Sequence, residues 1–506
     1  MEALTISSRS GSVAWFVQDD WKVTPQVTFH YGLRWDSDQP RWEKNNRQSS
    51  FNREAINPVC GCAGVVTFSG RNGLSKFAHE RDWNNFGPRA GVSWRATEKT
   101  VIRAGAAILY TPLYSLEVGR FFNLGFSKQG DFVSPDNGLT PAFLLSAGFP
   151  AIGAPSEADL TPGFGAVPIG ASPRVAVDFL EPGRFDNGYL ETFSFSVQRQ
   201  LPGNAVLELA YVGNLGHKLA GAQPRSINQV PPQLMGPGNA QVRRPFPQFS
   251  DVLIYNAPIG NSNYHGMNVR FEKRYSHGLQ VHANYTWSKL IDDVRAQVEI
   301  GGNPDFINFY DRRADRGLAN NHVSHRFIAS GVGDIPVGRG RAVRLSHPLL
   351  DAVAGGWSLA VIAELRSGVP YGVVENVNRT NAFSQGNRPN VVGKPDLPSD
   401  RSRNAYLAEW FNVQAFAAAP DFTFGNAGRS VGIGPGAVAI DASVLKSFQI
   451  YENHRLQFRA EMLNLPNHPN FANPNTARGR ADFGRITGLA PGNASRIIQL
   501  ALRYSF

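Results

Sequence analysis

The sequence has little charge, two cysteines and no long apolar run, and each shortage excludes a class of protein. Charged residues make up 18% of the 506 residues, below the roughly 25% of an ordinary soluble domain. A membrane-spanning helix needs about 18 consecutive apolar residues, and no apolar run here reaches half that length. Intrinsic disorder goes with few aromatic residues, whereas 11% of this chain is aromatic. We therefore expect a folded chain without transmembrane helices.

The two cysteines, Cys60 and Cys62, stand in a Cys-Gly-Cys triplet. This spacing is too tight for an ordinary disulfide framework, and no neighbouring His or Cys completes a zinc site. The formal net charge is +10, but the basic residues are scattered mostly singly, which argues against nucleic-acid binding. The opening residues lack the basic start and the apolar stretch of a signal peptide. We predict no metal, no cofactor and no nucleic-acid partner.

Apolar and polar residues alternate with a period of two through much of the chain. In residues 27–36, Val27, Phe29 and Leu33 fall on one face, as in a half-buried strand. Thirteen segments follow this template: residues 12–21, 27–36, 86–95, 100–110, 189–200, 205–213, 263–275, 279–288, 327–335, 357–367, 438–448, 455–465 and 497–506. Ten residues tilted by about 45° cover roughly 23 Å, close to the apolar band of about 25 Å of an outer-membrane barrel.

Short and long connections alternate between these segments. Tight turns are predicted at residues 22–26, 96–99, 201–204, 276–278 and 449–454, and long, mostly Gly/Pro-rich loops at 37–85, 111–188, 214–262, 289–326, 368–437 and 466–496. Structureless loops of this length argue against a compact soluble domain. A transmembrane barrel has short periplasmic turns at one rim and long extracellular loops at the other. Residues 336–356 break the rule, because they are too long for a turn.

The polar face of the predicted strands carries charges of both signs. If the apolar face meets lipid, these residues line the lumen, because Arg or Lys at the middle of the lipid face costs about 2 to 4 kcal/mol. Such a wall could hydrate a channel or hold a plug, although cross-strand ion pairs that support the barrel are the simpler explanation for any single residue. The candidate lumen-lining residues are Arg34, Arg89, Arg103, Arg270, Glu272, Glu364, Arg459 and Glu461.

Residue types that can support catalysis occur on one predicted strand and in one predicted loop. His282, Asn284 and Ser288 share a polar face, but same-face neighbours on a strand lie about 7 Å apart, too far for the hydrogen bond that activates a nucleophile. One Gly-x-Ser-x-Gly match, residues 428–432, falls in a Gly-rich loop, whereas a nucleophile elbow lies between a strand and a helix. We predict that the protein is not an enzyme and has no catalytic residues.

Several longer segments follow one another along the chain: WFVQDDWKVTPQVTFHYGLRWD, NFGPRAGVSW, KTVIRAGAAILY, FSVQRQLPGNAVLELAYVGNLG, SNYHGMNVRFEKRYSHGLQVHANYTWSKLIDD, RADRGL, HRF, GPGAVAIDASVLKSFQI and LQFRAEMLNLPNHPNF. From about Ser12 to Phe506 they resemble the barrel of TonB-dependent outer-membrane transporters, specifically the Oar-like subgroup. The resemblance implies a receptor or transporter in the outer membrane of a Gram-negative bacterium. Such proteins have a large barrel filled by an N-terminal plug, and they take up ligands with energy transmitted by TonB.

Strand parity leads to an expectation about the extent of the barrel. The last predicted strand ends on the short-turn side, so thirteen strands place the start of the first on the long-loop side. A complete bacterial barrel has an even number of strands and both ends in the periplasm. We therefore expect the C-terminal part of a barrel of about 22 strands, with residues 1–11 as an N-terminal stub and residues 12–506 as the barrel. The plug and the carboxypeptidase-regulatory-like domain of such transporters have no counterpart in this sequence. We therefore expect TonB to act only through N-terminal regions outside residues 1–506.

The end of the chain resembles the signal that the barrel assembly machinery reads, with Tyr504 and Phe506 as its aromatic residues. An exposed strand of alternating apolar residues can pair at its edge. Alternatively, Phe506 only completes an aromatic girdle. The expected partners are outer-membrane lipid, the assembly machinery and an unknown ligand. The sequence leaves open whether this ligand is taken up or exported. A passive porin-like channel or a surface adhesin is the alternative function.

Overall fold

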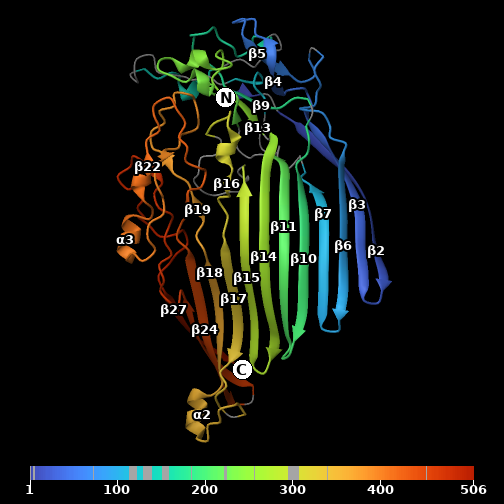
Figure 1. Ribbon diagram of the computed structural model, residues 1–506, viewed down its shortest axis with the longest axis vertical. Helices are drawn as coiled ribbons and strands as arrows, with labels where there is room; N and C mark the ends of the chain where they lie inside the picture. The colour runs from blue at the N-terminus through green and yellow to red at the C-terminus, as the bar shows by residue number, and fades with distance from the viewer. Residues whose placement is uncertain are drawn as a thin grey trace.

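The computed structural model describes residues 2–3, 6–71, 73–112, 122–128, 140–150, 156, 159–183, 185–220, 225–255, 257–293, 307–338, 340–451 and 453–506. Its main feature is one antiparallel sheet in which thirteen strands follow each other in chain order (Figure 1). These strands are β2 (Ser8–Thr24), β3 (Val27–Glu43), β6 (Asn85–Thr97), β7 (Thr100–Tyr110), β10 (Tyr189–Leu201), β11 (Ala205–Ala220), β14 (Pro258–Ser276), β15 (Leu279–Asp292), β17 (His325–Asp334), β18 (Trp357–Arg366), β24 (Ala437–Tyr451), β25 (His454–Leu463) and β27 (Ile497–Ser505). All thirteen predicted segments are strands of this sheet, so the expected all-β antiparallel fold is confirmed.

The short turns lie together at one end of the sheet (Figure 1). Between β14 and β15, Ser276 is opposite Leu279, so His277 and Gly278 form a two-residue turn. Both have positive φ, 54° and 76°, as in a type I′ turn, whose twist matches that of the strands it joins. Gly278 takes this conformation without strain, and the turn fixes the register of the pair.

The described sheet is open. β2 is at one edge, paired with β3, and β27 is at the other, paired with β25. The thirteen strands of this sheet agree with the number predicted from the sequence.

The two faces of the sheet differ in chemistry. Directly opposed residues of an antiparallel pair lie on the same face of the sheet. The register therefore places the aromatic residues at both ends of the strands on a single face. These are Trp21, Trp35, Trp94, Tyr110, Tyr211, Trp287, Trp357 and Phe448. On the same face Trp15 is 69% exposed and Leu502 is 67% exposed. An exposed apolar surface of this extent needs a non-aqueous neighbour.

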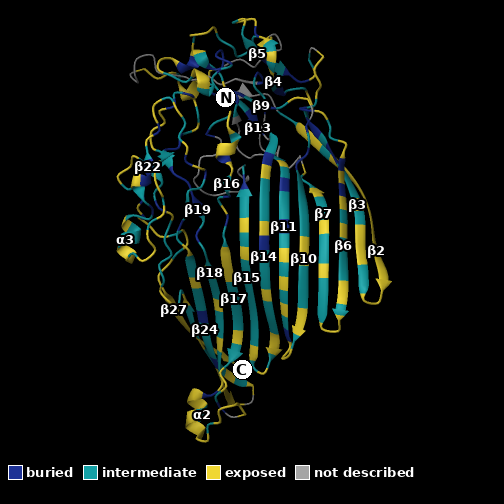
Figure 2. Cartoon of the chain, viewed as in Figure 1, coloured by how far each residue is buried: buried dark blue, intermediate teal, exposed yellow. Residues whose placement is uncertain are grey.

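The predicted long connections lie at the other end of the sheet, and their described residues contain short paired strands. β4 (Ser49–Ile56) pairs with β5 (Ala63–Phe68), and β9 (Val177–Leu180) runs parallel to β13 (Val252–Tyr255). Apolar residues of connections 37–85, 111–188 and 214–262 form one buried core. We call the described residues of these three connections the loop cap. The most buried members of its core are Phe51, Val66, Val177, Phe179, Phe249 and Val252. Figure 2 shows buried residues concentrated in these loops rather than along the strands.

A second buried cluster lies in connection 368–437. Tyr371, Phe411 and Phe416 pack together, and Phe483 of the last long connection packs against them. The same connection contains the short helix α3 (Arg403–Ala408). None of the helices among the described residues is both long and apolar enough to span a membrane.

Cys60 and Cys62 are bonded to each other. Gly61 between them has φ 66°, a left-handed conformation that glycine adopts easily. The disulfide is therefore a local feature of one loop and does not link distant segments.

Candidate ligand-facing surface and loop cap

The eight candidate lumen-lining residues share the polar face of the sheet. The register carries this face from strand to strand: Gly32 is opposite Arg89, Ser93 is opposite Arg103, and Glu208 is opposite Arg270. The pairing from β3 to β25 places all eight residues on the face opposite the aromatic residues. They are Arg34, Arg89, Arg103, Arg270, Glu272, Glu364, Arg459 and Glu461.

Most of these charges are paired within the polar face. Arg270 bonds Glu272 at 2.9 Å and Arg459 bonds Glu461 at 3.1 Å, each pair two residues apart on one strand. Glu364 accepts a hydrogen bond from Arg326 on the neighbouring strand at 2.9 Å. Because these side chains are partly exposed, each pair contributes only about 0 to 1 kcal/mol of stability. The pairs keep charge on the polar face without fixing it rigidly.

Several clefts open on the polar face, and two of them contain residues predicted from the sequence. One, of about 540 Å³, lies over the middle strands and is lined by polar residues that include Glu208, Asn268, Arg270, His282, Asn284 and Ser330. The other, of about 370 Å³, lies at the loop end of β3 and β6 and includes Arg34, Asp36, Asp38, Arg89, Tyr110 and Asn187. Three of the residues expected from the sequence therefore line clefts: Arg34, Arg89 and Arg270.

Asn85 was not expected from the sequence and lies next to the second cleft. It is opposite Asp36 in the register and fully buried. Neither its Oδ1 nor its Nδ2 has a hydrogen-bond partner among the described residues. A buried amide without partners costs about 1 to 3 kcal/mol, so this position is not explained by folding of the strand alone. Its sequence signal is weak, because Asn85 lies where a loop ends and a strand begins.

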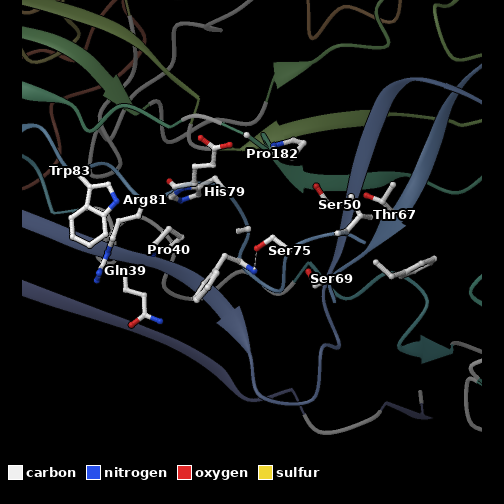
Figure 3. Close-up of a pocket in the computed structure, with 16 residues that line it drawn as sticks. Gln39, Pro40, Ser50, Thr67, Ser69, Ser75, His79, Arg81, Trp83 and Pro182 are labelled. Carbon is white, nitrogen blue, oxygen red and sulfur yellow. Dashed lines mark hydrogen bonds between the residues drawn. The ribbon is translucent and has the colours of Figure 1, made fainter. Parts of the chain in front are cut away.

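A cavity of about 810 Å³ lies in the loop cap (Figure 3). Trp83 and Arg81 lie on one side of it and Ser50 and Thr67 on the other. The Trp83 ring stacks on Trp35 with centroids 6.1 Å apart, and the Arg81 guanidinium lies 4.7 Å from the Trp83 ring. Flat aromatic surface, a cation and hydroxyl groups thus meet in one cavity. The sequence predicted a loop here and did not predict the cavity.

Buried ion pairs hold the loops above the polar face. Arg388 Nη2 lies 2.9 Å from Asp315 Oδ1, with side chains 5% and 2% exposed, and Arg429 pairs with Asp292 at the end of β15. Asp315 lies in connection 289–326, which the sequence predicted to be a long loop. Its buried carboxylate ties this connection to connection 368–437.

His322 of the same segment is also buried, with 3% exposure. Its Nδ1 accepts the backbone N–H of Leu290 at 3.2 Å, and its Nε2 lies 3.0 Å from Ser324 Oγ. Burial, with a smaller contribution from Lys289, lowers the pKa of His322. The imidazole is therefore neutral in the folded loop at physiological pH.

The Gly-x-Ser-x-Gly match has a structural role. Ser430 Oγ accepts the backbone N–H of Leu318 at 3.1 Å. Gly432 begins the short strand β23 (Gly432–Ile433), which pairs with β19 (Pro370–Tyr371). The serine therefore links two connections and is not placed on a turn between a strand and a helix. Among the described residues no three His, Cys, Asp or Glu side chains are grouped to hold a metal ion.

Comparison with protein families identifies the architecture. A family model described as an outer membrane beta barrel domain matches residues 3–499. The chain belongs to this family. Its location in the outer membrane of a Gram-negative bacterium follows, and the apolar face of the sheet is its lipid-facing surface. No curated protein is significantly similar in sequence.

Solved structures of outer-membrane receptors resemble this outer membrane beta barrel domain at low identity. The siderophore receptor PiuA from Acinetobacter baumannii is 13% identical, with TM-score 0.40, over 98% of this chain and 43% of that one. FpvA of P. aeruginosa bound to heterologous pyoverdines is 10% identical, with TM-score 0.44, over 99% and 39%. The ferric-catecholate import receptor Fiu from K12 E. coli is 12% identical, with TM-score 0.41, over 98% and 45%. The chain spans less than half the length of these three structures.

The last strand of the barrel domain presents its aromatic residues to the lipid-facing side. Tyr504 is opposite Leu456 in the register, and its hydroxyl lies 2.5 Å from His454 Nδ1. Phe506 is 89% exposed, with its ring 5.9 Å from that of Tyr504. The two residues are accessible to a partner that approaches the free edge of β27.

Proposed function

We propose that this outer membrane beta barrel domain is the wall of an Oar-like, TonB-dependent receptor that transports a ligand across the outer membrane. The observation that carries the proposal is the continuous polar face, which runs from β3 to β25 and has folded loops at one end. A passive pore needs a wet wall but not a structured cap with its own cavity. A receptor needs both, because the ligand is bound before it is moved.

In this proposal the eight charged residues named from the sequence line the lumen. Pairs such as Arg270–Glu272 and Arg459–Glu461 are half-exposed and two residues apart, so they can exchange partners at little cost. Exchangeable charge suits a wall that holds a removable plug or guides a polar ligand. TonB itself would act through segments other than this wall.

The cavity of the loop cap is the proposed site of first contact with ligand. Trp83 offers an aromatic surface, and Arg81, Ser50 and Thr67 offer donors around it. Small-molecule sites combine apolar walls with a few convergent polar groups in this way. No catalytic role is proposed, since Ser430, the residue of the only nucleophile-like motif found in the sequence, serves the loop structure.

Uptake measurements in bacteria that make the protein test the proposal. Cells that carry or lack the gene are supplied with radiolabelled siderophores, oligosaccharides and peptides, with TonB present or depleted. We expect at least one class to enter about tenfold more slowly when either the gene or TonB is removed. Uptake that needs the gene but not TonB would show a passive channel instead, and no dependence on the gene for any class would contradict transport.

A further inference from the structure

The connection 336–356 is the long exception at the short-turn end of the sheet, and it contains the helix α2 (Pro348–Ala354). In Figure 1 α2 lies beyond the ends of the strands at this rim. His347 caps its first turn, accepting the Leu349 N–H at Nδ1. A tight turn would suffice to join β17 to β18, so the helix calls for a separate explanation.

The C-terminal end of α2 is attached to the lipid-facing side of the sheet. Lys446 Nζ donates hydrogen bonds to the carbonyl oxygens of Ala352, Val353 and Gly355, at 2.5, 3.0 and 2.6 Å. Trp357 Nε1 donates to the Val353 carbonyl at 2.9 Å. Lys446 and Trp357 are directly opposite each other in the register, on the face that carries the aromatic residues. A cation at a helix C-terminus also complements the helix dipole.

The outer surface of α2 is apolar and uncovered among the described residues. Leu349 is 72% exposed, Leu350 is 58% exposed and Val353 is 70% exposed. None of these side chains contributes to a core of the protein. The helix that carries them is joined to the lipid-facing side of β18 and β24 through Trp357 and Lys446.

The residues before the helix are basic. Connection 336–356 contains three Arg and one Asp. Arg341 and Arg344 are exposed, and Arg341 bridges to Asp334 at the end of β17, with 3.0 Å between Nη2 and Oδ2. Basic residues beside an apolar helix face match a membrane surface with phosphate headgroups.

We propose that connection 336–356 anchors the barrel in the periplasmic leaflet of the outer membrane. Leu349, Leu350 and Val353 enter the acyl region, and Arg344 contacts a phospholipid headgroup. A short amphipathic helix lies in the plane of the interface in this way, and Trp357 belongs to the interfacial aromatic belt. The inference rests on membrane location and not on transport, so the two proposals can fail separately.

Depth-dependent fluorescence quenching tests the position of the helix. Because Cys60 and Cys62 are bonded to each other, a Leu350→Cys variant of the full chain has one free thiol for an environment-sensitive fluorophore. The matched control is Val377→Cys, 59% exposed in connection 368–437. In phosphatidylcholine vesicles we expect doxyl-labelled lipid to quench the label at 350 at least threefold more than the label at 377, and aqueous iodide to do the reverse. Equal iodide quenching with no lipid quenching at 350 would overturn the proposal.

The headgroup contact is tested by adding phosphatidylglycerol to the vesicles. We expect the lipid quenching at 350 to rise about twofold with the anionic lipid, and Arg344→Glu to abolish this rise. Lys394→Glu, an exposed change in connection 368–437, should leave it unchanged. A rise that persists in Arg344→Glu would refute the assigned headgroup contact, and circular dichroism of each variant shows that the strands have formed.

Discussion

Arg388 and Asp315 form a salt bridge in which both side chains are almost fully buried, although 73 residues separate them along the chain. Arg388 also donates to the Ala314 carbonyl at 2.7 Å. Removing one partner of such a pair leaves an uncompensated buried charge, which costs about 3 to 5 kcal/mol. We expect Arg388→Ala to open connections 289–326 and 368–437, seen as faster hydrogen–deuterium exchange in both.

The matched control for this prediction is Arg379→Ala. Arg379 pairs with Asp421 at 3.6 Å, with side chains 63% and 59% exposed, so its loss should cost no more than about 1 kcal/mol. If Arg388→Ala exchanged no faster than Arg379→Ala, the buried pair would not hold the two connections together.

Phe51 is the centre of the loop cap. It is 1% exposed and its ring lies 5.5 Å from that of Phe179 and 5.0 Å from that of Phe246. Phe51→Ala should cost about 3 to 5 kcal/mol of local stability and make the cap sensitive to limited proteolysis. Ile56→Ala, at a position that is 66% exposed, should leave proteolysis unchanged. Equal resistance of the two variants would show that the cap does not depend on this core.

The strands could be predicted because their signal is local. One face of the sheet is apolar and the other is polar, so apolar and polar residues alternate along each strand. Ten residues of this alternation are enough to recognise a strand such as Val27–Glu43. The common face of Arg34, Arg89 and Arg270 follows from the same alternation. Alternation within each strand is enough to place these three residues on one face, because neighbouring strands of an antiparallel sheet share their faces.

The loop cap and the ion pairs could not be predicted, because their partners are distant in the chain. Phe51 and Phe246 follow no shared period, and nothing local relates Asp315 to Arg388. The helix α2 did leave a signal: Pro348 precedes Leu349, Leu350 and Val353 at helical spacing. The length of residues 336–356 predicts only that the connection is not a tight turn.

The buried His322 should make the loops less stable in acid. Its pKa is lowered in the folded protein, so below its unfolded pKa of about 6.5 the unfolded loop binds a proton that the folded loop does not. Stability therefore falls as the pH falls from about 6.5 toward the lower folded value. His322→Asn, which keeps an acceptor for the Leu290 N–H, should reduce the difference in proteolysis rate between pH 7.5 and pH 5.5. An unchanged difference would assign the acid sensitivity to other groups.

Phe506 and Tyr504 should matter for insertion into the membrane. Both are exposed at the free edge of β27, where a partner strand can add. We expect deletion of Phe506 to lower the amount of protein in isolated outer membranes several-fold, with Ser505→Ala as the control. Normal insertion without Phe506 would limit its role to the aromatic girdle.

The assignment of the two faces can be tested with a single charge placed on neighbouring residues of β6. Val92 is opposite Phe29 and Ala104 on the lipid-facing side, and Ser93 is opposite Arg103 on the polar side. Arg in the middle of the lipid face costs about 2 to 4 kcal/mol, so Val92→Arg should lower the urea midpoint of folding in vesicles and the yield in outer membranes. Ser93→Arg should cost less, because the added charge stays on the wet side and its repulsion from the opposed Arg103 amounts to only about 0.2 to 1 kcal/mol. The reverse order of the two variants would mean that Arg34, Arg89 and Arg103 face lipid, and the proposed lumen wall would then have to be abandoned.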